Sequence, residues 1–415
     1  MTDVSPTEVG SVVLQIVEKT PIVDLHTHLY PPAFGDLLLW GVDETLTYHY
    51  LIAEALRRSP IAYDALWNLS TTERADHIWE SLFVRTSPVS EATRGVLTCL
   101  QILGMESHYP DLNRIRKAFS VWSAEEFVNL IFKKANLEFV VMTNDPFDPK
   151  ERAVWDREPK IDPRFRAALR VDPLLTDWPR ACAVLSDLGY SASVALDEGT
   201  CAEIRRFLLT WMERMDPLYM AVSLPPTFRF PSEDETGKLI ESCILPAARD
   251  RGIPLALMIG VKRGVNPMLR LAGDGVGKAG LQAVENLCAS YPDNRFMATM
   301  LSREDQHELC VAARKFRNLF PFGCWWFTNV PSIIREITAE RIELLGLSFA
   351  PQHSDARILD QLLYKWTHSR QIIAEVLIEK YTDLMRTGWP LYTEDIEQDI
   401  KDLFADNFKR FIGRT

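Results

Sequence analysis

The stretch PIVDLHTHL (residues 21–29) is a short apolar run that ends in two histidines one residue apart. Along an extended strand the side chains of residues i and i+2 point to the same face, so this spacing brings the imidazoles of His26 and His28 together at one strand end. Neutral imidazole is the commonest metal ligand. The pair therefore predicts half of a metal site, with surface or hydrogen-bonded histidines as the alternative. Asp24 either orients a ligand from behind or is solvated.

Length and composition are those of a globular enzyme. The chain has 415 residues, of which 47% are hydrophobic and 25% are charged, so it can bury a large core and disorder is not expected. No apolar run is long enough to span a bilayer, and the N-terminal sequence MTDVSPTEVG lacks the basic and apolar regions of a signal peptide. We therefore expect a cytoplasmic protein.

Charge and cysteine content argue against several kinds of partner and chemistry. The 46 Lys and Arg residues against 57 Asp and Glu residues give a net charge of −11, which disfavours nucleic acid and anionic membranes. An anionic substrate would need local cations to hold it. The seven cysteines include no Cys-x-x-Cys pair, so they predict reduced, buried thiols rather than a zinc finger or a disulfide framework.

Eight short apolar or β-branched runs recur along the chain and predict strands. Because the runs are continuous rather than alternating, we expect burial on both faces, and helical patterns between them, such as residues 202–215, indicate parallel crossover units. Eight such units favour a closed (β/α)8 TIM-like barrel, an α/β fold. The runs cover residues 21–28, 139–146, 167–173, 219–226, 254–260, 295–302, 320–327 and 347–355.

Helical periodicity accounts for two longer segments. Residues 35–135 carry helical patterns with polar caps, as in Ser70 to Phe83, and predict a helical insertion after strand 1. Residues from about 368 to 412 predict a C-terminal helical extension outside the barrel. No low-complexity linker or internal repeat marks a boundary, so we expect residues 1–415 to form a single domain.

A carboxylate that could complete the metal site follows the eighth run. The first and eighth strands of a closed barrel are neighbours, and active sites lie at the carboxyl ends of the strands, so Asp355 would face His26 and His28. Two imidazoles and one carboxylate make an open zinc site with a position left for water or a substrate oxygen. Taken alone, Asp355 could instead cap a helix or pair with Arg357.

Seven motifs lie in order along the chain, mostly at predicted strand ends, and the paired tryptophans followed by Asp-x-Arg make the set specific. They are DLHTHL (24–29), TYHYL (47–51), TNDPFD (143–148), LRVDP (169–173), MIGVKRGVNP (258–267), GCWWF (323–327) and HSDAR (353–357). On these motifs the chain resembles the uronate isomerases of the amidohydrolase superfamily over essentially its whole length.

The resemblance implies a (β/α)8 barrel with one divalent cation, usually zinc, held by His26, His28 and Asp355. It also implies a reversible isomerisation of D-glucuronate to D-fructuronate and of D-galacturonate to D-tagaturonate. Binuclear hydrolases of the superfamily carry histidines on strands five and six, which this chain lacks. Many uronate isomerases also carry a histidine where this chain has Met258, and a thioether is a poor zinc ligand. We therefore expect one metal that does not use this position.

Moving a hydrogen from carbon 2 to carbon 1 of an aldose requires one base and a group that stabilises the developing oxyanion of a cis-enediol. Asp355 is the leading candidate for the base, although its role as a metal ligand would compete. By the same resemblance, Tyr50 would exchange a proton with a substrate oxygen, and His49 would hydrogen-bond the enediol. Aromatic packing beneath a loop is the alternative for both.

Substrate binding is expected from two arginines and two tryptophans. The guanidinium groups of Arg170 and Arg357 offer planar, permanently charged forks for the uronate carboxylate and for an enediolate oxygen. Trp325 and Trp326 would supply an apolar wall for a sugar face. The alternatives are structural ion pairs for the arginines and simple core filling for the tryptophans.

Two other functions remain open on the sequence. A mononuclear metal-dependent hydrolase or lactonase could use the same barrel on a sugar-acid derivative. A non-catalytic sugar-acid binding protein is the third possibility, which the retained site residues disfavour. The expected partner is a small-molecule uronate, and a homo-oligomer is the expected assembly.

Overall fold

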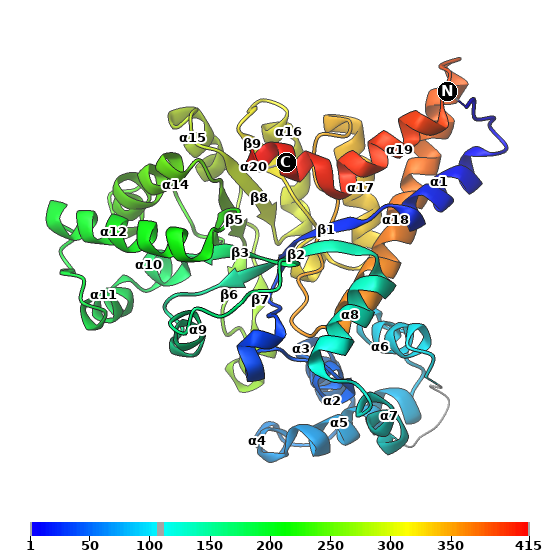
Figure 1. Ribbon diagram of the computed structural model, residues 1–415, viewed down its shortest axis with the longest axis horizontal. Helices are drawn as coiled ribbons and strands as arrows, with labels where there is room; N and C mark the ends of the chain where they lie inside the picture. The colour runs from blue at the N-terminus through cyan, green and yellow to red at the C-terminus, as the bar shows by residue number, and fades with distance from the viewer. Residues whose placement is uncertain (1, 106–111, 414–415) are drawn as a thin grey trace.

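The computed structural model describes residues 2–105 and 112–413. Its centre is one curled sheet of seven parallel strands in the order β1-β2-β3-β4-β5-β8-β9 (Figure 1). The strands are β1 (Ile22–Thr27), β2 (Leu137–Asn144), β3 (Phe165–Arg170), β4 (Met220–Leu224), β5 (Leu255–Ile259), β8 (Phe296–Met300) and β9 (Leu319–Pro321). This sheet with its surrounding helices is the α/β, TIM-like barrel class that the sequence predicts.

The prediction of an eighth strand over residues 347–355 is wrong. Within this range only Ala350 forms a bridge, to Phe322. Residues 350–356, here called the closing segment, nevertheless lie between β9 and β1. The Ala350 N–H donates to the Pro321 carbonyl at 3.2 Å, and the Asp355 N–H donates to the His26 carbonyl at 3.1 Å. The segment is irregular because Pro351 has no N–H to donate, and because the Asp24 side chain, rather than a strand, accepts the Ser354 N–H at 3.0 Å.

Burial follows the pattern expected of strands covered on both faces. Every residue of β1, β5 and β8 is buried. The side chains divide into a large core between sheet and helices and a smaller cluster that includes Val23, Ala256 and Met258. Consecutive side chains of a strand point to opposite faces, so each strand contributes to both clusters.

Among the described residues between β1 and β2, helices are the only regular secondary structure, as predicted for the insertion. Most of these helices lie below the sheet in the view of Figure 1. Ser70 and Ser123 begin two of them with capping boxes, in which a glutamate three residues later returns the hydrogen bond. The elements are η1 (Pro32–Leu37), α2 (Val42–Leu46), α3 (His49–Arg58), α4 (Tyr63–Asn68), α5 (Thr71–Trp79), η2 (Glu80–Val84), α6 (Glu91–Ile102), α7 (Leu112–Phe119) and α8 (Ala124–Ala135).

The crossover helices that follow β2 to β9 match the predicted alternation of strand and helix. A short antiparallel pair, β6 (Val261–Lys262) and β7 (Gly275–Val276), comes after β5 and was not predicted. The helical elements are α9 (Pro149–Trp155), α10 (Asp172–Thr176), α11 (Trp178–Asp187), α12 (Glu198–Met215), α13 (Glu235–Leu239), η3 (Ile240–Ile244), α14 (Leu245–Arg251), η4 (Pro267–Gly273), α15 (Gln282–Ser290), η5 (Arg303–Asp305), α16 (Gln306–Ala313), η6 (Trp326–Thr328) and α17 (Pro331–Leu345).

The C-terminal part of the chain is helical, as expected. It comprises α18 (Gln361–Arg386), α19 (Thr393–Lys401), η7 (Asp402–Asp406) and α20 (Asn407–Ile412), and α18 packs against α1 (Val9–Lys19), α6 and α17. Among the helices in the described ranges, none is long and apolar enough to cross a membrane. All seven cysteines are buried free thiols, in line with the sequence.

Candidate metal and substrate site

The two histidines of β1 and the aspartate of the closing segment meet at one end of the sheet. His28 Nε2 lies 3.3 Å from Asp355 Oδ1, and His26 Nε2 lies 3.7 Å from the same oxygen. One ligand atom from each residue lies within 4.8 Å of the others. The closing segment therefore places the carboxylate where the sequence expects it, although it is not a regular strand.

The donor set fits a metal ion on two observations of this structure. Asp355 Oδ1 is buried and has no hydrogen-bond partner within the described part of the chain, so its lone pairs are left for a cation. Burial, together with neighbouring His28, lowers the pKa of His26 to about 3, and burial together with Arg357 lowers that of His28. Both imidazoles therefore remain neutral at physiological pH, which is the form that binds metal.

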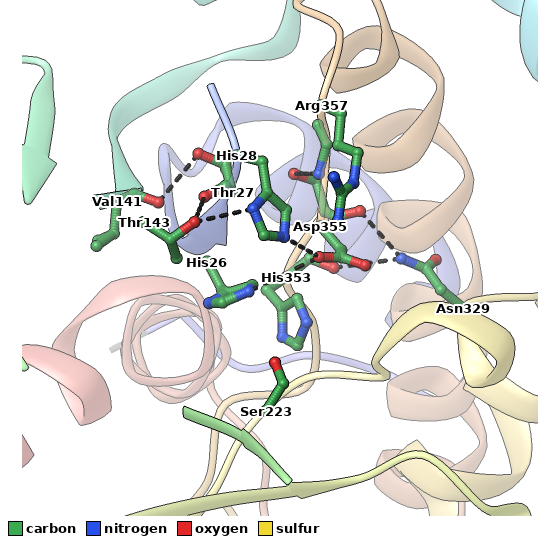
Figure 2. Close-up of polar contacts among 12 residues, drawn as sticks. His26, Thr27, His28, Val141, Thr143, Ser223, Asn329, His353, Asp355 and Arg357 are labelled. Atoms are coloured by element: carbon green, nitrogen blue, oxygen red, sulfur yellow. Dashed lines mark hydrogen bonds and ion pairs between the residues drawn. The ribbon is translucent and has the colours of Figure 1, made fainter. Parts of the chain in front are cut away.

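The remaining ring nitrogen of each histidine lies against a hydroxyl group. Tyr219 OH lies 3.2 Å from His26 Nδ1, and Thr143 Oγ1 lies 2.9 Å from His28 Nδ1. Figure 2 shows His28 between Thr143 and Asp355. Hydrogen bonds of this kind orient the rings of metal-binding histidines.

The two candidate arginines differ in what they contact. Arg170 forms a fork with Asp172, from Nη2 to Oδ1 at 2.7 Å and from Nε to Oδ2 at 3.0 Å. Arg357 lies beside His28 (Figure 2), and no ion pair holds its guanidinium among residues 2–105 and 112–413. Arg357 is thus the arginine whose donors are left for an anion, whereas binding by Arg170 would use only the part of its guanidinium that Asp172 leaves open.

The predicted residues of the insertion come from α3 and reach the segment after β9. The His49 ring lies 5.7 Å from the Trp326 ring and 4.5 Å from the Tyr50 ring, centroid to centroid. His49 Nε2 and Trp326 Nε1 are buried and lack a hydrogen-bond partner in the described chain. Trp325 is buried next to Trp326, with ring centroids 6.1 Å apart. Two orphaned polar atoms on facing elements are what a polar ligand would satisfy.

Burial sets the protonation state of the two α3 residues. It raises the pKa of Tyr50 well above its usual value, with the phenol of Tyr48 acting in the same direction. It also lowers the pKa of His49, with help from the positive charge of Arg357. Tyr50 therefore keeps its proton and His49 remains neutral at physiological pH, so Tyr50 is a hydrogen-bond donor and His49 has a lone pair on one ring nitrogen.

Three further residues near the site, Tyr219, Thr143 and Lys365, did not emerge from the sequence, whereas His353 is a position where the sequence offers a partner for the metal ligands. Tyr219 and Thr143 contact the histidines, and the ring of fully buried His353 lies 5.2 Å from that of His26, centroid to centroid. Lys365 of α18 is buried with its amine 5.8 Å from the centroid of the Tyr50 ring. Thr143 opens a recognised motif, but the contact of Tyr219 with a histidine 193 residues away leaves no sequence signal.

Asp24 is buried, so the solvated alternative is wrong. Its carboxylate accepts hydrogen bonds from the Ser354 N–H at 3.0 Å and from Trp366 Nε1 at 2.8 Å. It therefore anchors the closing segment one residue before Asp355, rather than touching a histidine side chain. Met258 is buried on β5 and contributes to the smaller core cluster.

The curled parallel sheet and the His-x-His and carboxylate cluster place the chain among α/β barrel enzymes whose sites are built for a metal ion. A uronate isomerase from Bacillus halodurans C-125 is 53% identical, with 99% of this chain and 98% of that chain covered and a TM-score of 0.98. The chain belongs to the uronate isomerase family. No protein-family model matches it, and no curated protein matches its sequence.

Two more distant structures share the fold. A glucuronate isomerase from Caulobacter crescentus is 16% identical, covering 100% of this chain and 95% of that chain, with a TM-score of 0.78. A metal-dependent hydrolase from Lactobacillus casei ATCC 334, named as putative, is 12% identical with 97% of both chains covered and a TM-score of 0.55. The family relationship supports an isomerase and not the hydrolase or lactonase alternative.

Proposed function

We propose that this protein interconverts D-glucuronate with D-fructuronate and D-galacturonate with D-tagaturonate. The observation that carries the proposal is the 53% identity to a uronate isomerase over 99% of this chain. The cluster of His26, His28 and Asp355 also supports the proposal, because these residues could hold a metal ion. This protein and the Bacillus halodurans isomerase should therefore act on the same class of small-molecule substrate, a uronate.

The cofactor is proposed to be one divalent ion, Zn²⁺, held by His26, His28 and Asp355. Two imidazoles and a carboxylate match the ligands that zinc prefers, and three protein ligands leave an open position. When bound, the ion would supply Lewis-acid stabilisation of a substrate oxygen. The lack of a histidine at Met258, and the packing of that side chain in the core, fit a single ion.

Asp355 is proposed to move the proton from carbon 2 to carbon 1. Oδ1 faces the two imidazoles, so Oδ2 is the oxygen assigned to the substrate. A single carboxylate can take the carbon-2 proton and return it to carbon 1 when both carbons of a cis-enediol present the same face. This division of the carboxylate between its two oxygens would let one residue serve as ligand and as base.

The other candidate residues would hold the substrate and its developing charge. Arg357 has a guanidinium free of protein carboxylates in the described chain and is assigned to an oxygen of the uronate or the enediolate. Tyr50 keeps its proton and would donate to a substrate oxygen, and His49 would hydrogen-bond the enediol. Arg170 would contribute positive charge near the uronate carboxylate, and Trp325 and Trp326 would contact a sugar face.

A direct assay tests the proposal. Purified, zinc-loaded protein is incubated with D-glucuronate, D-galacturonate and, as neutral controls, D-glucose and D-galactose, and ketose formation is measured. The expected result is ketouronate from the two acids and little or no ketose from the neutral sugars, because these lack the carboxylate that the positive charges of Arg357 and Arg170 would hold. No ketouronate from either acid would refute the assignment.

We also propose that the protein is located in the cytoplasm and assembles as a homo-oligomer.

A further inference from the structure

The two histidines among the three candidate metal ligands share an arrangement that the proposed chemistry does not by itself require. Each imidazole has Nε2 toward Asp355 Oδ1 and Nδ1 toward a hydroxyl from another strand or loop. We infer that Tyr219 and Thr143 are positioning residues that hold His26 and His28 in the tautomer with the proton on Nδ1. The inference rests on the proposed metal centre, because this tautomer leaves both Nε2 lone pairs for an ion.

The single proton of the Tyr219 hydroxyl is used in a hydrogen bond to the backbone of Leu25. Its oxygen lies 2.6 Å from the carbonyl oxygen of Leu25, a separation at which a proton must lie between the two oxygens. A carbonyl has no proton, so Tyr219 is the donor. Toward His26 Nδ1, at 3.2 Å, the hydroxyl can then only accept. Tyr219 is fully buried, so water does not compete for either contact.

Thr143 repeats this arrangement on the other histidine. Its hydroxyl donates to the Thr27 carbonyl at 3.0 Å and lies 2.9 Å from His28 Nδ1. Because the one hydroxyl proton points to the carbonyl, the Nδ1–H of His28 must be the donor to Thr143. Figure 2 shows the chain of contacts that runs from Thr27 through Thr143 and His28 to Asp355.

A backbone irregularity explains why the Thr27 carbonyl is available. The pairing of β1 with β2 shifts register between Asp24 and Thr27, and such bulges leave ladder groups unpaired and re-aim side chains next to active sites. Here two hydroxyls bridge the strands: Thr27 Oγ1 donates to the Val141 carbonyl at 3.0 Å, and Thr143 Oγ1 donates to the Thr27 carbonyl. The bulge thereby fixes the direction of the Thr143 proton.

The result is a cluster of lone pairs. A neutral imidazole carries one N–H, so with Nδ1 protonated both Nε2 atoms face Asp355 Oδ1 without a proton. That oxygen indeed has no hydrogen bond in the described chain. Three acceptor atoms that face one another repel unless a cation lies between them, so the two hydroxyls prepare the cluster for an ion before it arrives.

Zinc affinity of the metal-free full chain tests the inference, measured by competition with a chelator of known affinity. Thr143→Val and Tyr219→Phe remove one acceptor each with little change of shape, and we expect affinity to fall about 10- to 100-fold in each. Thr143→Ser keeps the hydroxyl and should restore affinity. Thr20→Val is the matched control, since it removes a buried hydroxyl-to-carbonyl bond, from Thr20 Oγ1 to the Ile16 carbonyl at 2.8 Å, that belongs to none of these contacts. It should leave affinity within about threefold.

Nitrogen-15 spectra of histidine-labelled, metal-free protein read the tautomers directly. The signals assigned to His26 and His28 should show protonated Nδ1. The tautomer of His28 should change in Thr143→Val and that of His26 in Tyr219→Phe. Wild-type affinity in both variants, or an equal loss in Thr20→Val, would overturn the positioning role. Protonated Nε2 on His26 or His28 in the wild type would also overturn it. Failure of the wild type to bind zinc would instead refute the proposed metal centre, while the spectra would still decide the tautomers.

Discussion

Asp355 combines features that an ordinary loop carboxylate lacks. Its backbone φ is 53°, in the left-handed region that non-glycine residues seldom adopt, its N–H is bound by the His26 carbonyl, and its Oδ1 faces two imidazoles. Backbone strain of this kind costs about 1–3 kcal/mol and persists where the surroundings enforce it, often at functional sites. The strain thus accompanies a carboxylate whose position is fixed by its surroundings, as its proposed roles as ligand and base require.

Replacing Asp355 with Asn tests its proposed role as base. The amide has nearly the same shape but cannot take a proton from carbon 2, so we expect kcat to fall by about 10²- to 10⁴-fold. Circular dichroism should show an unchanged fold. Zinc content must be measured alongside, because Asp355 is also a proposed ligand. Turnover within threefold of wild type in zinc-containing protein would remove Asp355 as the base.

Replacing Arg357 with Lys tests whether the planar fork matters. A lysine keeps the charge but not the two parallel donors, so we expect kcat/KM to fall by about 10- to 100-fold, a loss of roughly 1.4–2.7 kcal/mol in transition-state binding. The matched control is Arg214→Lys, which affects an ion pair with Asp156 at 2.7 Å on the surface, and should be neutral. Equal kinetics for the two variants would make Arg357 a structural residue.

Single residues also show where sequence reasoning stops. The meeting of His26, His28 and Asp355 was predictable, because it depends only on strand period and on which strands are neighbours. The fork between Arg170 and Asp172 was not, because the sequence places both at a strand end without saying whether they contact each other or a ligand. Their roles in catalysis stay predictions.

Among the structural elements, the closing segment shows the limit of pattern reading. Its apolar start and polar end predicted a strand beside β1, and the position is right although the strand is not. What shapes it are contacts with distant residues: Asn329 donates to the Ser354 carbonyl at 3.2 Å, and the Gln352 side chain accepts the Cys324 N–H at 2.8 Å. Long-range side-chain bonds of this kind have no local sequence pattern.

The start of α18 contains a carboxyl group that makes stability depend on pH. Burial raises the pKa of Asp360 from 3.8 to about 7, and its Oδ2 accepts the Gly41 N–H at 2.9 Å, joining α18 to the insertion. The folded protein therefore holds a proton that the unfolded chain releases at lower pH. This contribution to stability is fully present below pH 4 and is lost as pH rises toward and through 7.

Asp360→Asn should remove this dependence, because the neutral amide imitates the protonated acid. The free energy of unfolding of the variant minus that of wild type should therefore be about 2 kcal/mol larger at pH 8 than at pH 5.5, by the linkage relation. Urea unfolding of both proteins at the two pH values measures the difference. A difference that is the same at both pH values would contradict the raised pKa of Asp360.

For the whole molecule, the proposed metal should tie the sheet to the closing segment and so raise stability. An ion that binds only the folded chain adds about 2.7 kcal/mol when its free concentration is 100 times its Kd. We expect the thermal midpoint to fall after chelation and to rise again with added zinc in a concentration-dependent way. A midpoint that does not respond to zinc would contradict binding at this site.

The whole chain also shows how far the sequence could lead. Fold class, insertion, helical tail and family followed from strand and helix periods and from seven short motifs, and the relationship to a uronate isomerase supports them. The short pair β6 and β7 did not follow, because two-residue strands lie below what a periodic pattern can reveal.

Proton transfer by one carboxylate is the central claim, and NMR of the zinc-loaded protein with D-glucuronate in deuterium oxide tests it most directly. A carboxylate open to solvent exchange should deliver deuterium to carbon 1 of the ketouronate, and Asp355→Asn should slow turnover and incorporation to the same extent. Product that forms at the normal rate with no deuterium at carbon 1 in repeated reversible turnovers would contradict an exchanging base and indicate a direct hydride shift.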